Sequence, residues 1–152
     1  MWHGVALAGF DGDGRPDIAA SNAGRNTAYE LYPKPVRLFY GDADGDDVME
    51  LAEGFADTGT KQWKPIRKLD VFAKTFPQVR GMFTRNKAFA ASSLQQIIGP
   101  AFREMKSVEI RTLSSAVFLN KTGRFEMHPL PDAAQFSPAF GLCAGDLDGD
   151  GL

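Results

Sequence analysis

The chain has 152 residues, of which 43% are hydrophobic and 24% charged, with 17 Lys and Arg against 19 Asp and Glu. This composition is typical of an ordinary globular protein of about one domain, and it excludes a disordered, collagen-like or disulfide-stapled chain. The formal net charge of −2 provides no basic field for a phosphate backbone, so we expect no nucleic-acid partner. No stretch reaches the roughly 20 apolar residues of a membrane helix, and residues 1–8 lack the features of a secretory signal.

Short runs of β-branched and aromatic residues alternate along the chain with segments rich in glycine and aspartate, which predicts a mainly β fold. The N-K-T-G turn at residues 120–123 is expected to join two strands as a hairpin, with the glycine free to adopt a positive φ. Cys143 lies in the last apolar run and is expected to be a small buried side chain. The predicted strands cover residues 2–8, 17–21, 35–40, 49–53, 62–66, 107–120, 124–128 and 139–144.

The pattern changes to a helical period between residues 69 and 106. Apolar side chains recur there at spacings of four, three and four residues: Phe72, Phe76, Val79 and Phe83. Ser93 and Gln96 form a capping-box pattern, Gly99 is a C-terminal stop signal, and Pro100 suits the first turn of another helix. We therefore predict two or three short helices whose apolar face packs on a sheet, with a partner-binding surface as the alternative.

Three acidic clusters recur along the chain: GFDGDGRPD at residues 9–17, DADGDDVME at 42–50 and DLDGDGL at 146–152. We call them loop 1, loop 2 and loop 3. In a D-x-D-x-D-G-x-x-D frame, Gly9 replaces the first aspartate of loop 1, Asp47 replaces the glycine of loop 2, and loop 3 ends before its ninth position. Backbone carbonyls would come from position seven. The candidate metal residues are Asp11, Asp13, Arg15, Asp17, Asp42, Asp44, Asp46, Val48, Glu50, Asp146, Asp148 and Asp150.

Carboxylates at alternate positions repel one another, and a cation among them removes that repulsion. Calcium is a hard ion that takes six to eight oxygen ligands, so it suits a curled loop of this kind, whereas magnesium keeps more of its waters. Two alternatives remain open. The clusters could be solvated Asp-Gly turns, or loop 2, with Glu53 at position twelve, could be an EF-hand. Strand-like runs precede all three loops, which favours a calcium loop between β-strands.

The chain resembles FG-GAP and VCBS repeat proteins, and in particular the ASPIC/UnbV group related to cartilage acidic protein. The resemblance rests on VALAGFDGDGRPDIAASNAGRN, PVRLFYGDADGDDVMEL and SSAVFLNKTGRFEMHPLPDAAQFSPAFGLCAGDLDGDG. It implies integrin-like β-propeller blades whose loops hold calcium, and protein or glycan binding on the faces of the propeller. It also implies an extracellular, cell-envelope or periplasmic location and a role in adhesion or interaction.

We therefore expect a mainly β chain that forms a partial β-propeller of about two four-stranded antiparallel blades with a short helical insertion. The expected division is 1–68 for propeller repeats with two calcium loops, 69–106 for the helical insertion, and 107–152 for blade strands that end in the truncated third loop. Further blades of the parent chain would be partners. No nucleophile elbow, phosphate loop, dinucleotide fingerprint or zinc-ligand spacing occurs, so we expect no catalytic residue and no enzymatic activity. The alternative is an ancillary propeller of a carbohydrate-active enzyme.

Overall fold

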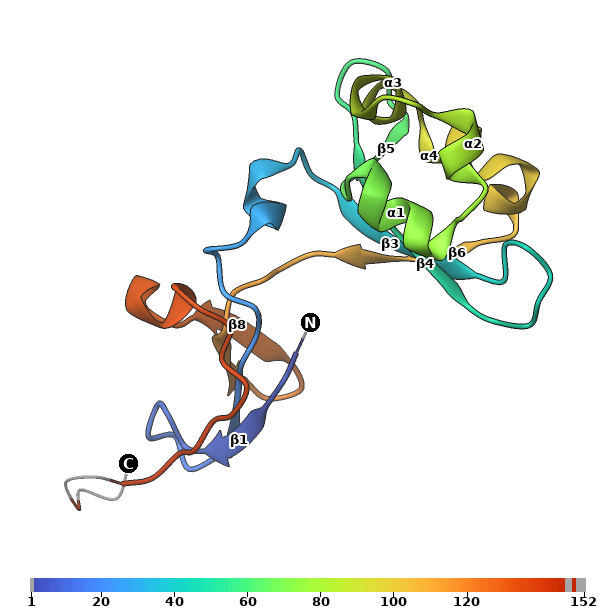
Figure 1. Cartoon of the computed structure of the whole chain (residues 1–152). Helices are drawn as coiled ribbons and strands as arrows, with labels where there is room; N and C mark the ends of the chain where they lie inside the picture. The colour runs from blue at the N-terminus through green and yellow to red at the C-terminus, as the bar shows by residue number, and fades with distance from the viewer. Residues whose placement is uncertain (1, 147–148, 150–152) are drawn as a thin grey trace. The chain divides into compact units, whose positions relative to one another are not determined.

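The computed structural model describes residues 2–146 and Gly149, and it divides into two compact units (Figure 1). The terminal unit combines residues 1–30 with residues 112–152, and the central unit comprises residues 31–111. Each unit contains one four-stranded antiparallel sheet, and the helices are short. The prediction of a mainly β chain with four-stranded antiparallel sheets is therefore confirmed. No helix in the described residues is long and apolar enough to cross a membrane.

The sheet of the terminal unit follows the chain order, β1-β2-β7-β8, although the central unit is inserted between its second and third strands. Its strands are β1 (Val5–Ala8), β2 (Asp17–Ala20), β7 (Ala116–Asn120) and β8 (Phe125–Pro129). The pairing Ile18↔Phe118 joins β2 to β7 across the insertion, and the predicted N-K-T-G hairpin joins β7 to β8. A short 3-10 helix, η3 (Asp132–Gln135), follows the sheet. Four consecutive antiparallel strands thus form one meander.

Buried polar side chains fix the segments that flank this meander. Asn22 and Ser115 are almost inaccessible, and the amide of Asn22 donates to Ser115 Oγ at 3.0 Å. The side chain of Gln135 accepts from the amide of Ser115 and donates to the carbonyls of Ser115 and Leu130, each at 2.9 Å. Burying a polar group is costly unless it is hydrogen-bonded, so these pairings fix where the chain enters β7 and leaves β8.

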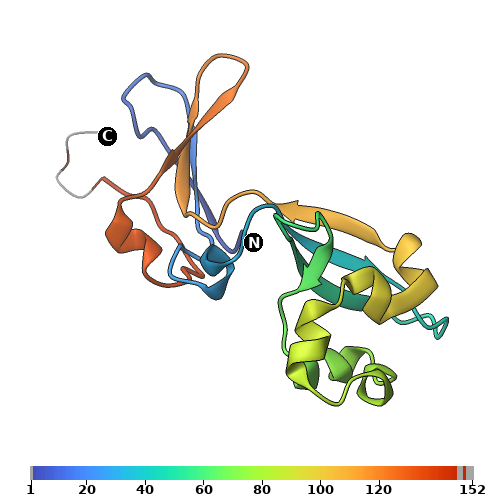
Figure 2. The ribbon, with the colours of Figure 1, turned by 90° about the horizontal axis from the view of Figure 1, so that it is seen from above.

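The sheet of the central unit has the order β5-β4-β3-β6. Its strands are β3 (Val36–Gly41), β4 (Glu50–Ala56), β5 (Trp63–Pro65) and β6 (Lys106–Ile110). Between β5 and β6 lie α1 (Leu69–Thr75), α2 (Val79–Met82), α3 (Asn86–Ala91), α4 (Leu94–Ile98) and the 3-10 helix η2 (Gly99–Arg103), and the four α-helices gather over the sheet in Figure 2. A further 3-10 helix, η1 (Ala28–Leu31), spans the division between the units.

The helices bury one face of the central sheet. Phe39 of β3 and Ala52 of β4 share a core cluster with Phe72, Phe76 and Val79, among other helical side chains. The predicted apolar stripe therefore packs on the sheet, although Pro77 divides it between α1 and α2. The capping box of Ser93 and Gln96 is present, and Gly99 ends α4 with φ 82°. The helices are shorter and more numerous than the two or three we predicted.

Two sequence predictions of local structure are wrong. Residues 107–120 were expected to form one strand, but they divide into β6 and β7, because the first half pairs with β3 and the second with β2 and β8. In the connection the amide of Ser114 donates to Thr112 Oγ1 and Leu113 is buried. Residues 139–144 form no strand, since they run outside both sheets and lack a partner strand in the described chain. Cys143, expected to be buried, is consequently exposed.

Each sheet carries apolar side chains on a face that stays accessible. In the terminal sheet Val5 and Leu7 are 64% and 68% exposed, and the strand register places them on the same face as Phe118 and Met127. In the central sheet Leu51 and Val108 are 52% and 55% exposed, on the face opposite to the helices. Isolated exposed apolar residues are ordinary, but a row of them along one sheet face is typical of a surface that packs against another element.

Candidate metal-binding loops

Loops 1 and 2 occupy the same position in two β-hairpins. Residues 9–16 connect β1 to β2, where Ala8 pairs with Asp17, and residues 42–49 connect β3 to β4, where Gly41 pairs with Glu50. Both connections have the same length, and the acidic residue at position nine of each frame begins the second strand. Strands rather than helices flank both loops, so the EF-hand alternative for loop 2 is wrong.

The backbones of the two loops repeat one conformation. Positions four and six have positive φ in both: 71° and 79° at Gly12 and Gly14, and 82° and 64° at Gly45 and Asp47. Aspartate adopts the left-handed region more readily than most residues, which explains how loop 2 keeps this shape without the second glycine. Gly149, at position four of loop 3, has a φ of 79°.

The carboxylate at position nine accepts a hydrogen bond from the amide at position two in both loops. The amide of Phe10 donates to Asp17 Oδ2 at 2.8 Å, and the amide of Ala43 donates to Glu50 Oε2 at 2.6 Å. At positions five and seven, the amide of Arg15 donates to Asp13 Oδ1 and that of Val48 to Asp46 Oδ1, at 2.9 and 2.8 Å. The sequence alignment of the two clusters therefore corresponds to one structural motif that occurs twice.

Loop 2 brings carboxylates together without a cationic partner. Asp42, Asp44 and Glu50 each offer one oxygen, and these three oxygens lie within 4.8 Å of one another. Within the described part of the chain, no lysine, arginine or histidine forms an ion pair with the acidic side chains of this loop. This is the single group of three or more such ligands among the described residues that could hold a metal ion.

The surroundings of loop 2 shift the pKa values of two of its carboxyl groups in opposite directions. Desolvation, followed by the negative charges of Asp46 and Glu50, raises the pKa of Asp44. The pKa of Asp42 is lowered, mainly because the amide of Gly45 donates to its Oδ1 at 2.7 Å; the amide of Asp47 donates to its Oδ2 at 3.1 Å. The ionised form of Asp44 therefore lacks the compensation that a nearby positive charge would supply.

Two other predicted residues of loop 2 lie beside this group. Asp46 accepts from the amide of Val48 with one oxygen and adds its charge close to Asp44. The side chain of Val48 is exposed, as expected for a position that would supply only its backbone carbonyl. The donor set of Asp42, Asp44 and Glu50 consists of hard oxygen atoms, the type of ligand that hard cations take.

Loop 1 distributes its carboxylates differently. Asp11 pairs with Lys121 of the β7–β8 turn, and Asp13 pairs with Arg15 of the loop itself. The hydrogen bond between Lys121 and Asp11 favours both charged forms, so it raises the pKa of the lysine and lowers that of the aspartate. Gly9 has no side chain to offer. The aspartates at positions three and five of loop 1 therefore each have a basic partner.

Asp17, also predicted as a metal ligand, is wholly buried and holds two strands together. Its Oδ2 accepts from the amide of Phe10 at 2.8 Å and its Oδ1 from the amide of Asn120 at 2.7 Å. The carboxylate thus fastens the start of β2 to loop 1 on one side and to the end of β7 on the other. Both oxygens have a backbone partner.

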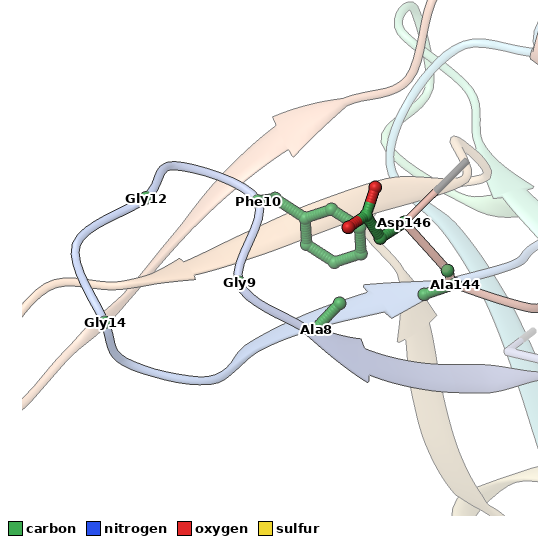
Figure 3. Close-up of a pocket in the computed structure, with 8 residues that line it drawn as sticks. Ala8, Gly9, Phe10, Gly12, Gly14, Ala144 and Asp146 are labelled. Carbon is green, nitrogen blue, oxygen red and sulfur yellow. The ribbon is translucent and has the colours of Figure 1, made fainter. Parts of the chain in front are cut away.

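Loop 3 is described only in part. Asp146 Oδ1 accepts from the amide of Gly149 at 2.6 Å, as Asp42 Oδ1 does from the amide of Gly45 in loop 2. Asp148 and Asp150 lie outside the described residues. Asp146 also lines a pocket of about 540 Å³ together with residues of loop 1, and Figure 3 draws Asp146 and Phe10 among its lining residues.

Sequence reasoning missed the partners of loop 1. Asn120 and Lys121 belong to the N-K-T-G turn, whose pattern predicts a hairpin and gives no sign that the turn meets residues more than 100 positions away. The half-buried Arg15 side chain was not expected to contribute either. Arg15 is a basic residue within an acidic loop, and this signal in the sequence could have predicted an ion pair there.

Comparison of the chain with protein-family models, with curated proteins and with solved structures gives no match.

Proposed function

We propose that this chain is a non-enzymatic calcium-binding β module in which loop 2 holds the ion. The observation that carries the proposal is the group of Asp42, Asp44 and Glu50, whose oxygens converge at a hairpin turn where no basic side chain of the described residues forms an ion pair with them. Calcium there would supply positive charge to carboxylates that otherwise repel one another. Its role is structural: it stabilises the connection between β3 and β4.

The architecture of the terminal unit, which does not contain loop 2, supports a β-propeller blade as part of this module. The terminal sheet is a four-stranded antiparallel meander in the order β1-β2-β7-β8, which is the form of a propeller blade. Its accessible apolar face, which includes Val5 and Leu7, is suited to packing on a neighbouring blade of a parent chain. The acidic hairpin loops and this meander together favour the FG-GAP and VCBS type of module.

The weak affinity of such loops suggests where the module works. Extracellular calcium modules bind with Kd on the order of 10⁻⁴ to 10⁻³ M. A site of that affinity fills outside the cell or in a cell envelope and stays largely free of calcium in a cytosol. We propose that the module serves adhesion or interaction with a protein or glycan there.

The test is a calorimetric titration of the full chain with calcium, comparing wild type with Asp44→Asn. We expect Asp44→Asn to weaken calcium binding at loop 2 at least about tenfold, because it removes one charged ligand oxygen. Asp47→Asn is the matched control, since it removes the same charge from the same loop but lies outside the ligand group. Equal binding by wild type and Asp44→Asn would contradict the proposal.

The melting temperatures of the same proteins provide a second, independent test of calcium binding at loop 2. In excess chelator, Asp44→Asn should melt at or above the wild-type temperature, because the substitution removes repulsion by Asp46 and Glu50. In millimolar calcium the order should reverse, because wild type gains binding energy that the variant lacks. If wild type and Asp44→Asn keep the same order of melting temperatures in chelator and in calcium, that result would count against a metal at loop 2.

A further inference from the structure

Loop 1 repeats the backbone of loop 2, yet cations of the protein itself already neutralise it. The ammonium group of Lys121 lies on Asp11 Oδ2, and the guanidinium of Arg15 lies on Asp13 Oδ2. Arg15 is also held in place, because its Nε donates to the carbonyl of Asn120 at 2.8 Å. Both cations therefore belong to one surface that the β7–β8 turn and loop 1 form together.

The corresponding positions of loop 2 carry no such groups. Val48 stands where loop 1 has Arg15, and no lysine or arginine of the described chain pairs with Asp44, the counterpart of Asp11. Loop 2 has Asp42 at position one, where loop 1 has Gly9. The two loops thus share a backbone conformation and differ in the source of their positive charge.

We propose that loop 1 is closed to divalent cations because Lys121, together with Arg15, acts as a built-in cation that replaces the metal ion at this turn. The function of loop 1 is then to lock the β1–β2 hairpin onto the β7–β8 hairpin at any calcium concentration. Lys121 ties the two hairpins through Asp11, and Asn120 beside it ties them through Asp17. The contrast with loop 2 rests on the calcium binding proposed above, whereas the role of Lys121 in loop 1 does not.

The structure also indicates how loop 1 could be converted into a metal site. A Cβ added at Gly9 would have Arg15 O as its neighbour at 3.8 Å, which is an ordinary van der Waals contact, so the first atom of a side chain meets no clash at this position. Replacing Arg15 by Val copies the residue of loop 2, and Lys121→Met keeps the length of the side chain without its charge. The converted loop has aspartates at positions one, three and five, as loop 2 does, and keeps Asp17 as the acidic residue at position nine.

The experiment counts bound calcium by equilibrium dialysis on the full chain in an Asp44→Asn background, in which we expect calcium binding at loop 2 to be weakened. Adding Gly9→Asp, Arg15→Val and Lys121→Met together should create one additional site, with a Kd within about tenfold of that of loop 2 in the wild-type chain. Gly9→Asp alone should create none, because both cations remain. A folded converted chain with no additional site, or an additional site with Gly9→Asp alone, would overturn the proposal.

A second measurement does not depend on any calcium binding. In excess chelator, Lys121→Met should lower the melting temperature, and Asp11→Asn added to it should restore part of the loss, because the uncompensated carboxylate is then absent. A Lys121→Met variant that melts like wild type in chelator would overturn the role of Lys121. This holds even if loop 2 binds no metal, so the failure of one proposal is distinguishable from the failure of the other.

Discussion

Asp17→Asn tests whether the ninth position of loop 1 is a structural acceptor or a metal ligand. The side chain is wholly buried, and its two oxygens accept from the amides of Phe10 and Asn120 at 2.8 and 2.7 Å. Hydrogen bonds to a charged group contribute about 1.5–3 kcal/mol each, and neutral ones about 1 kcal/mol. Asparagine keeps one acceptor and turns an NH₂ group towards the second amide, so one bond is lost and the other becomes neutral.

We therefore expect Asp17→Asn to lower the free energy of unfolding of the terminal unit by about 2–5 kcal/mol. The assay is urea unfolding followed by the fluorescence of Trp2, which packs edge-on against Phe118 of β7. Replacing Trp63 of the central unit by Phe leaves Trp2 as the reporter. A unit of this size should also melt at least about 8 °C lower.

Asp13→Asn is the matched control, since it removes one charge from the same loop but breaks only a surface ion pair with Arg15. Such pairs contribute about 0–1 kcal/mol, so this variant should stay close to wild type. Two results would refute the reasoning. One is an Asp17→Asn variant within about 0.5 kcal/mol of wild type, and the other is a deficit that appears only when calcium is present, as a ligand role would require.

Three further predictions concern the central unit. Gly54→Ala should cost about 1–3 kcal/mol in urea unfolding, because the added Cβ would lie 2.6 Å from Leu94 Cδ1 in a full core. Ser93→Ala should cost about 1 kcal/mol in the same assay through loss of the α4 cap, and a variant as stable as wild type would contradict this. The hydroxyl of Thr60 is the main cause that lowers the pKa of Asp57, so this carboxylate stabilises the folded state above its unfolded pKa of 3.8 and loses that effect as pH falls through its lower folded value. Thr60→Val should accordingly be more destabilising near neutral pH than in strong acid, and an equal loss at both would be inconsistent with it.

Local signals in the sequence were sufficient for much of the fold. Alternating short runs predicted most strands within a few residues, and the helical period with its capping box located the helices. These features depend on contacts between near neighbours in the chain, such as the one between Ser93 and Gln96. The strand prediction failed at residues 107–120 and 139–144, where pairing with distant strands decides the outcome.

The sequence by itself determined that loops 1 and 2 are turns of one type, because glycine or aspartate at positions four and six allows the backbone that both adopt. Only the tertiary structure decided how they differ. Lys121 reaches Asp11 across 110 positions of the chain, and Asn120 reaches Asp17 across 103, while the carboxylates of loop 2 meet no cation among the described residues. Electrostatic compensation depends on distance in space, and the spacing of residues along a chain does not specify that distance when the partner lies on another hairpin.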